Sequence, residues 1–262
     1  MSETGKQAHD NQSSHKMKTL PEERAEVDLS IVIPVYNEAQ LITEAVEELT
    51  RELDEWGQSY ELIIAENGSR DQTPSLARAL EERFSRVWTF STGEPNYGLA
   101  LKQGLLQSKG RIAICDEIDI CDLQFYRAAL ALLEQEPDVD FVVGSKRAPG
   151  AQDRRPLFRR LATGVLNSLL RVAVGFKGTD THGLKALRLK EITPIIESCV
   201  VDRDMFASEL VVRVHRSERN WREIPIDLRE KRPPSVHLLR RVPHVLKHIV
   251  RLFMIIRLGR DL

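Results

Sequence analysis

Short apolar segments rich in β-branched residues alternate with helical patterns along this chain. The first segment, LSIVIPVY from Leu29, precedes a predicted helix at residues 38–56 that Asn37 is expected to cap and Gly57 to end. The later segments are ELIIA, RVWTF, RIAIC and VDFVVG, with further helices predicted at residues 97–108 and 123–134. This alternation predicts an α/β fold built from βαβ units, in which helices cover both faces of a mostly parallel sheet.

Polar residues follow three of the predicted strands at the point where each strand ends. They occupy residues 36–38, 66–69 and 117–119. In open α/β sheets, ligands bind at the carboxyl ends of the parallel strands. The three strand ends are therefore expected to converge on one site.

The most unusual of these ends is the sequence RIAICDEIDICD, in which Asp116, Glu117, Asp119 and Asp122 follow an apolar run. Buried carboxylates without partners cost several kcal/mol, so a cation or a basic partner is expected there. On an extended chain Glu117 and Asp119 would point the same way, toward one divalent metal, and Asp116 would point to the opposite face. The alternative is an ordinary solvated acidic loop.

Composition indicates a globular protein with one sizeable domain, because 42% of its 262 residues are hydrophobic and 29% are charged. A net charge of −1 argues against a globally basic nucleic-acid-binding protein, and no nucleic-acid partner is expected. The cysteines Cys115, Cys121 and Cys199 form no C-x-x-C pair, which favours a reducing, cytoplasmic setting. Residues 1–27 are polar, lack the apolar segment of a signal peptide, and are predicted to be a disordered tail.

Four motifs occur in an order that resembles the family-2 glycosyltransferases of GT-A fold. They are PVYNE, ENGSRDQT after the second strand, N-x-G-x-A from Asn96, and E-x-D at Glu117 and Asp119. Further along, PLFRRLATGVLN, TDTHGLKALR and FASELVVRVHR resemble the second half of polyprenyl-phosphate hexosyltransferases of the dolichyl-phosphate mannose synthase type. The resemblance covers residues 29–235. It implies a Rossmann-like αβα sandwich, with a catalytic domain at residues 28–235.

The resemblance also assigns roles to individual residues. Glu117 and Asp119 would hold Mg²⁺ or Mn²⁺ on the diphosphate of a nucleotide-sugar donor, with Asp119, Glu209 and Arg159 as the catalytic residues. The positions expected to bind substrate are Pro34, Tyr36, Glu38, Glu66, Asn67, Lys146, Thr163, Lys185 and Arg232. Among these, Arg159 and Thr163 match a phosphate-binding R-x-x-x-S motif, and Lys146 stands where G-S-R has its arginine.

The sequence departs from the family pattern at several of these positions. Glu66 and Asn67 replace the two aspartates of D-D-G-S, which leaves the nucleotide base open. Glu117 is one methylene longer than the usual aspartate, so metal affinity is expected to fall and Asp116 to supplement it. Lys185 replaces the arginine of D-x-T-x-G-F-R.

The implied reaction is an inverting displacement at an anomeric carbon. A lipid phosphate acceptor is already anionic and needs no general base. A hydroxyl acceptor needs one, for which Asp202, Asp204 and Glu209 are the candidates. A third interpretation is a nucleotide-sugar-binding protein that has lost its transferase activity.

The C-terminal residues 236–262 are predicted to form a basic amphipathic helix. Residues 229–262 contain nine Lys or Arg and two acidic residues, and apolar residues repeat along one face from Leu246 to Ile256. The run is too short to span a bilayer, so we expect a peripheral contact with the inner face of a membrane. Packing of this helix on its own domain is the alternative.

Overall fold

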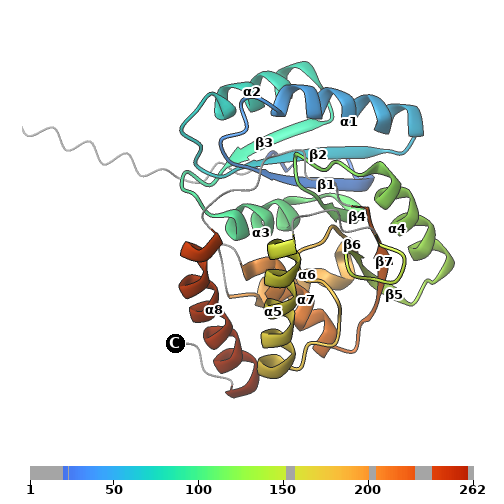
Figure 1. The fold of residues 1–262 in the computed structure, drawn as a ribbon. Helices are drawn as coiled ribbons and strands as arrows, with labels where there is room; N and C mark the ends of the chain where they lie inside the picture. Colours follow the sequence, from blue (N-terminus) through green and yellow to red (C-terminus); the bar gives the residue numbers. More distant parts are fainter. Residues whose placement is uncertain (1–19, 23, 152–156, 201–204, 228–237, 259–262) are drawn as a thin grey trace, which may run out of the picture.

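The computed structural model describes residues 20–22, 24–151, 157–200, 205–227 and 238–258 (Figure 1). One seven-stranded sheet, ordered β3-β2-β1-β4-β6-β5-β7, runs through it. Its strands are β1 (Val27–Val35), β2 (Tyr60–Glu66), β3 (Val87–Ser91), β4 (Gly110–Cys115), β5 (Val139–Ser145), β6 (Lys185–Arg188) and β7 (Asn220–Pro225). Only β6 is antiparallel to its neighbours β4 and β5, so the predicted mostly parallel sheet is confirmed.

Helices cover both faces of this sheet, as the sequence predicts. The helices are α1 (Ile42–Trp56), α2 (Thr73–Arg83), α3 (Tyr97–Gln107), α4 (Leu123–Gln135), α5 (Leu157–Val174), α6 (Leu189–Ser198), α7 (Phe206–Arg216) and α8 (Leu238–Leu258). Residues of α1, α2 and α4 form one hydrophobic cluster with the sheet, and residues of α3, α5, α6, α7 and α8 form the other. Strand β1 serves both clusters, because Ile31 and Ile33 face the first while Val32 faces the second.

The first helix starts later than predicted. Asn37 does not cap α1: its backbone is left-handed (φ 55°), and its side-chain oxygen accepts a hydrogen bond from Arg70 N at 2.8 Å. A turn that begins at Glu38 separates Asn37 from Ile42, the first residue of the helix. The end of α1 is as predicted, because Gly57 adopts the left-handed conformation (φ 77°) and donates to Leu53 O.

The folded part of the chain begins before the predicted boundary at residue 27. Leu20 is buried, and the buried guanidinium of Arg24 forms an ion pair with Glu61. Arg24 also donates to the carbonyl of Gln107 and lies over the ring of Trp88. The buried ion pair and this hydrogen bond join Arg24 to the sheet and to α3. The rest of the predicted tail, residues 1–19, lies outside the described residues.

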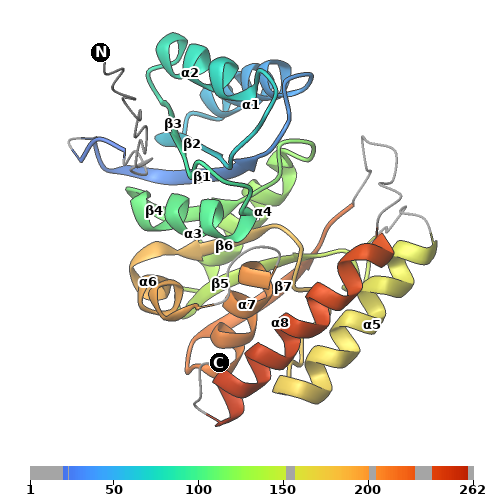
Figure 2. The same cartoon turned by 90° about the vertical axis from the view of Figure 1, so that its left-hand side faces the viewer.

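Helices α5 and α8 lie side by side at one end of the molecule, and both views agree on this (Figures 1 and 2). Ile249 and Leu252 of α8 are buried in the same cluster as Leu170 and Val174 of α5. The predicted C-terminal helix is therefore present, and one of its faces packs on its own domain. None of the described helices combines the length and the apolar character needed to cross a membrane.

Candidate active site

The polar segments predicted to converge do lie along one edge of the sheet. Val35 of β1 pairs with Glu66 of β2, and Val32 pairs with Cys115 of β4, so residues 36–38, 67–69 and 116–122 all follow the carboxyl ends of adjacent strands. Lys185 begins β6 beside the end of β4. Pro34 is buried within β1, whereas Tyr36 is 39% exposed and Glu38 is half-buried.

Hydrogen bonds fasten the first two of these segments to each other. Asn37 N donates to the hydroxyl of Ser69 at 2.9 Å, and Glu38 N donates to that of Thr73 at 2.7 Å. Asp71 accepts from Ala39 N at 3.2 Å and from the Thr73 hydroxyl at 2.6 Å. Burial raises the pKa of the Asp71 carboxyl, but the hydrogen bonds from Thr73 and Ala39 together outweigh it and hold the pKa below its ordinary value. The loops after β1 and β2 thus form one braced unit.

Glu66, predicted to take the place of the first aspartate of D-D-G-S, is 3% exposed. One carboxylate oxygen accepts a hydrogen bond from Ser69 N at 2.5 Å, and the other accepts the hydroxyl of Ser91 on β3. Asn67, also buried, donates its backbone N–H to Val35 O. Gly68, which follows Asn67, has φ 74°, and a methyl group there would stand 2.5 Å from the backbone of Glu94. Glu66 therefore braces the turn, and Ser91 is a partner that the sequence did not single out.

The acidic segment after β4 is a turn, not the extended chain assumed from the sequence. Ile120 N and Cys121 N both donate to Glu117 O, and Ile118 is buried in the core. The argument from alternation along a strand therefore does not apply to Glu117 and Asp119. Both side chains are half-buried on this turn because Ile118 packs inward between them.

Asp116 is buried and holds this turn instead of facing outward. Its oxygens accept the hydroxyl of Tyr126 and the backbone N–H of Glu117, each at 2.5 Å, and the N–H of Asp122 at 3.2 Å. Burial raises the pKa of the Asp116 carboxyl to about 7, although these hydrogen bonds oppose the rise. Tyr126, on α4, was another partner that the sequence pattern did not reveal.

Glu117 and Asp119 offer the carboxylate oxygens that a divalent metal takes when it also binds a substrate phosphate. Mg²⁺ sites in nucleotide enzymes often use only one or two carboxylates, with phosphate and water oxygens completing the shell. Burial raises the pKa of the Tyr97 hydroxyl well above its ordinary value, and the negative charges of Glu117 and Asp119 add to the effect. Within the described ranges, no group of three or more metal-binding side chains occurs.

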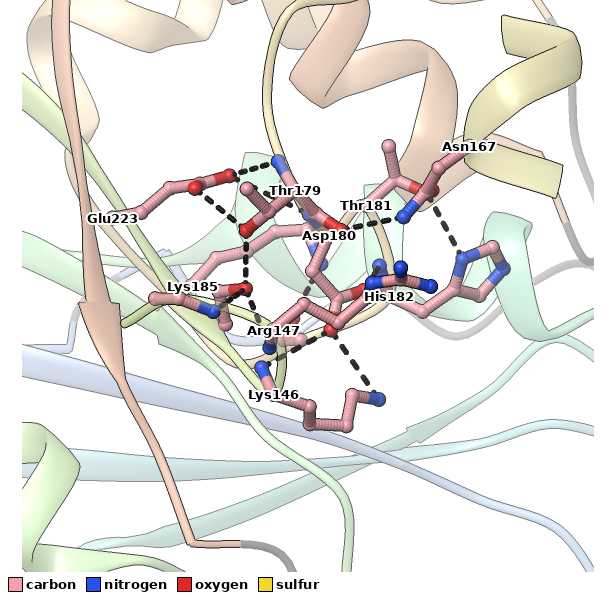
Figure 3. A network of polar contacts seen from close by, with 12 residues as sticks. Lys146, Arg147, Asn167, Thr179, Asp180, Thr181, His182, Lys185 and Glu223 are labelled. Carbon is pink, nitrogen blue, oxygen red and sulfur yellow. Dashed lines mark hydrogen bonds and ion pairs between the residues drawn. The ribbon is translucent and has the colours of Figure 1, made fainter. Parts of the chain in front are cut away.

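A second set of charged groups surrounds the loop at residues 179–182, beside the end of β5 (Figure 3). The fully buried Asp180 accepts a hydrogen bond from His182 N at 2.9 Å and lies 3.7 Å from the ammonium of Lys146. Burial alone would raise the pKa of Asp180, but Lys146 and the His182 N–H hold it below its ordinary value. His182 itself is exposed, and its Nδ1 lies 3.0 Å from the Thr181 hydroxyl.

Glu223 on β7 holds this loop in place (Figure 3). It accepts hydrogen bonds from the N–H and the hydroxyl of Thr179, both at 2.7 Å. The hydroxyls of Ser145 and Thr179 are 2.6 Å apart. A side chain at Gly183 would meet the carbonyl oxygen of Gly144 at 1.7 Å, so only glycine fits there. Glu223 lies in the segment REIPI, whose position opposite this loop no sequence pattern indicated.

Lys185 is 2% exposed, and its ammonium donates to Gly183 O at 2.7 Å. It forms no ion pair with any residue that the structure describes. Burial lowers the pKa of this ammonium, and the opposing attraction of the Cys115, Asp180 and Glu117 side chains only partly offsets the effect. Lys185 thus lies between the acidic turn and the 179–182 loop.

Glu209, a candidate base, lies on α7 with its carboxylate buried. It accepts Arg213 Nε at 2.7 Å and Val200 N at 3.1 Å. Asp202, Asp204 and Arg232 lie outside the described residues, and for Arg159 only the helical backbone is described. Thr163 is on the same helix, half-buried. The roles predicted for these residues remain predictions.

The sequence matches the family described as glycosyl transferase family 2 over residues 30–194, well over half of the chain. The chain belongs to glycosyl transferase family 2. The resemblance seen in the four motifs is thereby confirmed, and the seven-stranded sheet with helices on both faces is the GT-A-like fold expected from it.

Several curated relatives of this glycosyltransferase are named for polyprenyl-phosphate substrates. It is 31% identical over 175 residues to an undecaprenyl-phosphate 4-deoxy-4-formamido-L-arabinose transferase of Edwardsiella ictaluri, covering 64% of this chain and 51% of that protein. It is 25% identical over 240 residues to the glycosyltransferase AglD of Haloferax volcanii, covering 87% of this chain and 37% of AglD. The chain therefore spans from about a third to a half of these relatives' lengths.

Solved structures of glycosyltransferases share its fold. Glucosyl-3-phosphoglycerate synthase from Mycobacterium tuberculosis, crystallised with Mn²⁺, uridine diphosphate and phosphoglyceric acid, aligns with a TM-score of 0.59 and 19% identity. The alignment covers 87% of this chain and 78% of that one. Mannosyl-3-phosphoglycerate synthase from Rubrobacter xylanophilus also has a TM-score of 0.59, at 14% identity, with 87% and 74% covered. At these identities the likeness concerns the fold alone.

Proposed function

We propose that this family-2 glycosyltransferase moves a hexose, with inversion, from a nucleoside-diphosphate sugar to a polyprenyl phosphate. The observation that carries the proposal is the meeting of two differently charged regions at one edge of the sheet. Glu117 and Asp119 bring negative charge after β4, and Lys146 and Lys185 bring positive charge from β5 and β6. An acidic turn suits a metal–diphosphate donor, and basic groups suit an anionic acceptor.

On the donor side, the braced loops after β1 and β2 would bind the nucleoside. Tyr36 and Glu38 lie in the loop after β1, which is hydrogen-bonded to the turn that Glu66 braces. The base and ribose would lie along these two loops. Glu117 and Asp119 would hold Mg²⁺ or Mn²⁺, which neutralises the charge that develops on the leaving diphosphate. The buried hydrogen bonds of Asp116 keep that turn in one conformation.

In the transfer step, an oxygen of the acceptor phosphate attacks the anomeric carbon as the bond from that carbon to the diphosphate oxygen breaks. The electron pair of that bond leaves with the nucleoside diphosphate. Lys146 and Arg159 would supply fixed positive charge to the phosphates. No proton has to be removed from a phosphate that is already ionised.

The surroundings of Glu209 favour a phosphate acceptor over a hydroxyl acceptor. Its carboxylate is fully buried and is engaged by Arg213 and by the backbone of Val200. A carboxylate that is buried and already engaged by an arginine and a backbone N–H is poorly placed to reach the hydroxyl of an acceptor. The 31% identical relative, which is named for undecaprenyl phosphate, supports the same choice.

Exposed apolar side chains on α5 and α8 support a peripheral contact with a membrane. On α5, Leu161 is 69% exposed and Val172 is 84% exposed, and on α8 Val250 is 56% exposed. Lys247 is also exposed on α8. Apolar side chains beside basic ones on paired helices suit the headgroup layer of an anionic leaflet. We therefore propose a location on the inner face of a membrane.

Two measurements test the proposal together. Melting temperature is recorded with GDP, UDP and their hexose derivatives, with Mn²⁺ or with EDTA, because a ligand that binds only the folded state raises it. Transfer of radiolabelled sugar to a short-chain polyprenyl phosphate is then followed with the nucleotide that stabilises. A metal-dependent shift with transfer to the phosphate, and none to the parent polyprenol, is expected. Failure of every nucleotide sugar to bind or react would overturn the proposal.

A further inference from the structure

The C-terminal ends of α5 and α8 meet at one end of the molecule. The two helices lie side by side and run in the same direction, so their last turns are neighbours (Figure 2). Because α5 has 18 residues, about 27 Å separate this end from the start of the helix, which comes after the end of β5 in the chain. The C-terminal ends therefore lie well apart from the candidate active site.

Two arginines from different helices converge beside Gly175, the residue that follows α5. A methyl group on this glycine would stand 3.3 Å from Nη2 of Arg257 on α8 and 4.0 Å from Nη1 of Arg216 on α7. Both guanidinium groups therefore approach the same point. Lys177, two residues after the glycine, is exposed and adds a third positive charge to this end of the molecule.

The two arginines are held in place but keep most of their donors. Nη1 of Arg216 donates to Val174 O at 3.2 Å, and Nε of Arg257 donates to Ala173 O at 3.4 Å. A guanidinium has five N–H donors, so each arginine retains several for a ligand. Neither guanidinium forms an ion pair with a residue that the structure describes. Two positive charges are thus fixed near each other without a carboxylate from the described part of the chain.

A hollow of about 340 Å³ adjoins Arg216 between the ends of α6, α7 and α8. Arg213, Ser198 and Ser217 contribute its other polar groups, and isoleucines of α6 and α8 complete its lining. Arg213 is already paired with the buried Glu209 at 2.7 Å, so its charge is offset within the protein. Arg216 is the arginine of this hollow whose charge remains available to a ligand.

Exposed apolar side chains adjoin the two arginines. On α8, Leu246, Val250 and Phe253 are exposed at helical spacing, and Arg257 continues that stripe one turn later. Val172, in the last turn of α5, is also exposed. Apolar side chains that enter the headgroup layer of a bilayer place neighbouring arginines at the level of the lipid phosphates. The apolar stripe therefore favours a lipid phosphate over a soluble one.

We propose that Arg216 and Arg257 together bind the phosphate of an anionic phospholipid, and so hold the C-terminal ends of α5 and α8 at the membrane surface. A phosphodiester between two guanidinium groups accepts hydrogen bonds from both and neutralises their mutual repulsion. This inference rests on the membrane contact in the proposed function, to which it adds the class of lipid and the residues that select it.

The test measures sedimentation with two kinds of vesicle, one of phosphatidylcholine alone and one of phosphatidylcholine mixed with phosphatidylglycerol. The variants are Arg216→Ala, Arg257→Ala and the double variant, and melting temperature is recorded for each. A fourth variant changes both arginines to lysine, which keeps the two charges if alanine weakens the end of α5. Calorimetry with inorganic phosphate shows whether the arginines bind a phosphate without the lipid.

The matched control is a double variant with Arg51→Ala and Arg78→Ala. It removes the same charge from exposed positions on α1 and α2, which cover the opposite face of the sheet. Arg78 also resembles the proposed lipid ligands chemically, because its Nε donates to a helix carbonyl, Pro74 O, at 3.2 Å. Any loss of binding that comes only from the change in net charge should therefore appear in the control as well.

Each single alanine variant is expected to lower affinity for the anionic vesicles about fivefold, and the double variant about 25-fold, from the usual contribution of one basic side chain near such a surface. The lysine variant and the control should stay close to the wild type, and affinity for neutral vesicles and the nucleotide-induced rise in melting temperature should not change.

Anionic-vesicle affinity of the alanine double variant within twofold of the control would overturn the inference. Equal wild-type affinity for neutral and anionic vesicles would also overturn it, but would leave the membrane contact of the proposed function intact. Wild-type protein that binds neither vesicle would contradict both. Binding of inorganic phosphate that the double variant loses, with vesicle affinity unchanged, would assign the two arginines to a soluble phosphate instead.

Discussion

The two halves of the candidate site are stabilised in different ways. Around β1, β2 and β4, hydrogen bonds fix the motifs, either between two loops, as at Asn37 and Ser69, or between a helix and a turn, as at Tyr126 of α4 and Asp116. Around β5 and β6, buried charges at Asp180, Lys146 and Lys185 dominate. The first half can therefore hold a donor by backbone geometry, whereas the second depends on electrostatic balance inside the protein.

The largest expected effect comes from removing a carboxylate of the acidic turn. Asp119→Ala should lower transfer at least ~100-fold, equivalent to about 3 kcal/mol, because the metal would lose one of its two protein ligands. The metal-dependent rise in melting temperature with nucleotide should also disappear. The melting temperature without ligand should change little, since Asp119 is half-buried. Glu134→Gln, at an exposed carboxylate on α4, is the control. Unchanged activity would show that the acidic turn holds no metal that the transfer needs.

The second prediction breaks the charge balance of the other half. Asp180→Asn should reduce the free energy of unfolding by about 3 kcal/mol, because it leaves the Lys146 ammonium buried without a counter-charge. Urea unfolding measures the loss, and adding Lys146→Met should recover part of it. Glu47→Gln, which removes an exposed ion pair with Arg83, should cost less than about 1 kcal/mol. If Asp180→Asn and Glu47→Gln reduced the free energy of unfolding equally, the proposed electrostatic balance would be contradicted.

A smaller effect is expected for the brace beneath the donor loops. Ser91→Ala removes the hydroxyl that donates to the buried Glu66 carboxylate, which should cost about 1.5–3 kcal/mol of folding free energy and weaken nucleotide binding. Ser108→Ala is a suitable control, because its hydroxyl bonds only to a carbonyl within α3. Nucleotide affinity that stays at the wild-type value would restrict Glu66 to a purely structural role.

The smallest predicted effect concerns pH and the packing of the second half. Burial between Phe176 and Trp221 lowers the pKa of His215 from 6.5 to about 4, and the charge of Lys177 adds to this. The folded state therefore binds the proton less readily, and stability should fall as pH drops from about 6.5 toward 4. Because His215 is only partly buried, the free energy of unfolding is expected to fall by about 1 kcal/mol between pH 7 and pH 5, which lowers Tm by about 2–4 °C. In His215→Leu, this part of the acid-induced fall should vanish; an unaltered pH profile would exclude His215 as its source.

The motifs of the first half were more predictable than those of the second for a physical reason. Parallel strands that follow one another in sequence bring their carboxyl ends to one edge, so PVYNE, ENGS and E-x-D could be placed together without coordinates. The loop at residues 179–182 leads into β6, which is antiparallel to its neighbours. Its main partner, Glu223, is 44 residues away from Thr179 in the sequence. No local pattern reveals such a contact.

The sequence by itself determined the fold class, the family and the edge of the sheet where the chemistry belongs, because these follow from periodicity and from motif order along the chain. Only the tertiary structure decided which side chains are already engaged within the protein. It made the segment at Glu117 a compact turn, paired Glu209 with Arg213, and placed the Lys146 ammonium beside the buried Asp180 carboxylate. Hydrogen bonds and ion pairs depend on neighbours brought together in space, and that information exists only once the chain is folded.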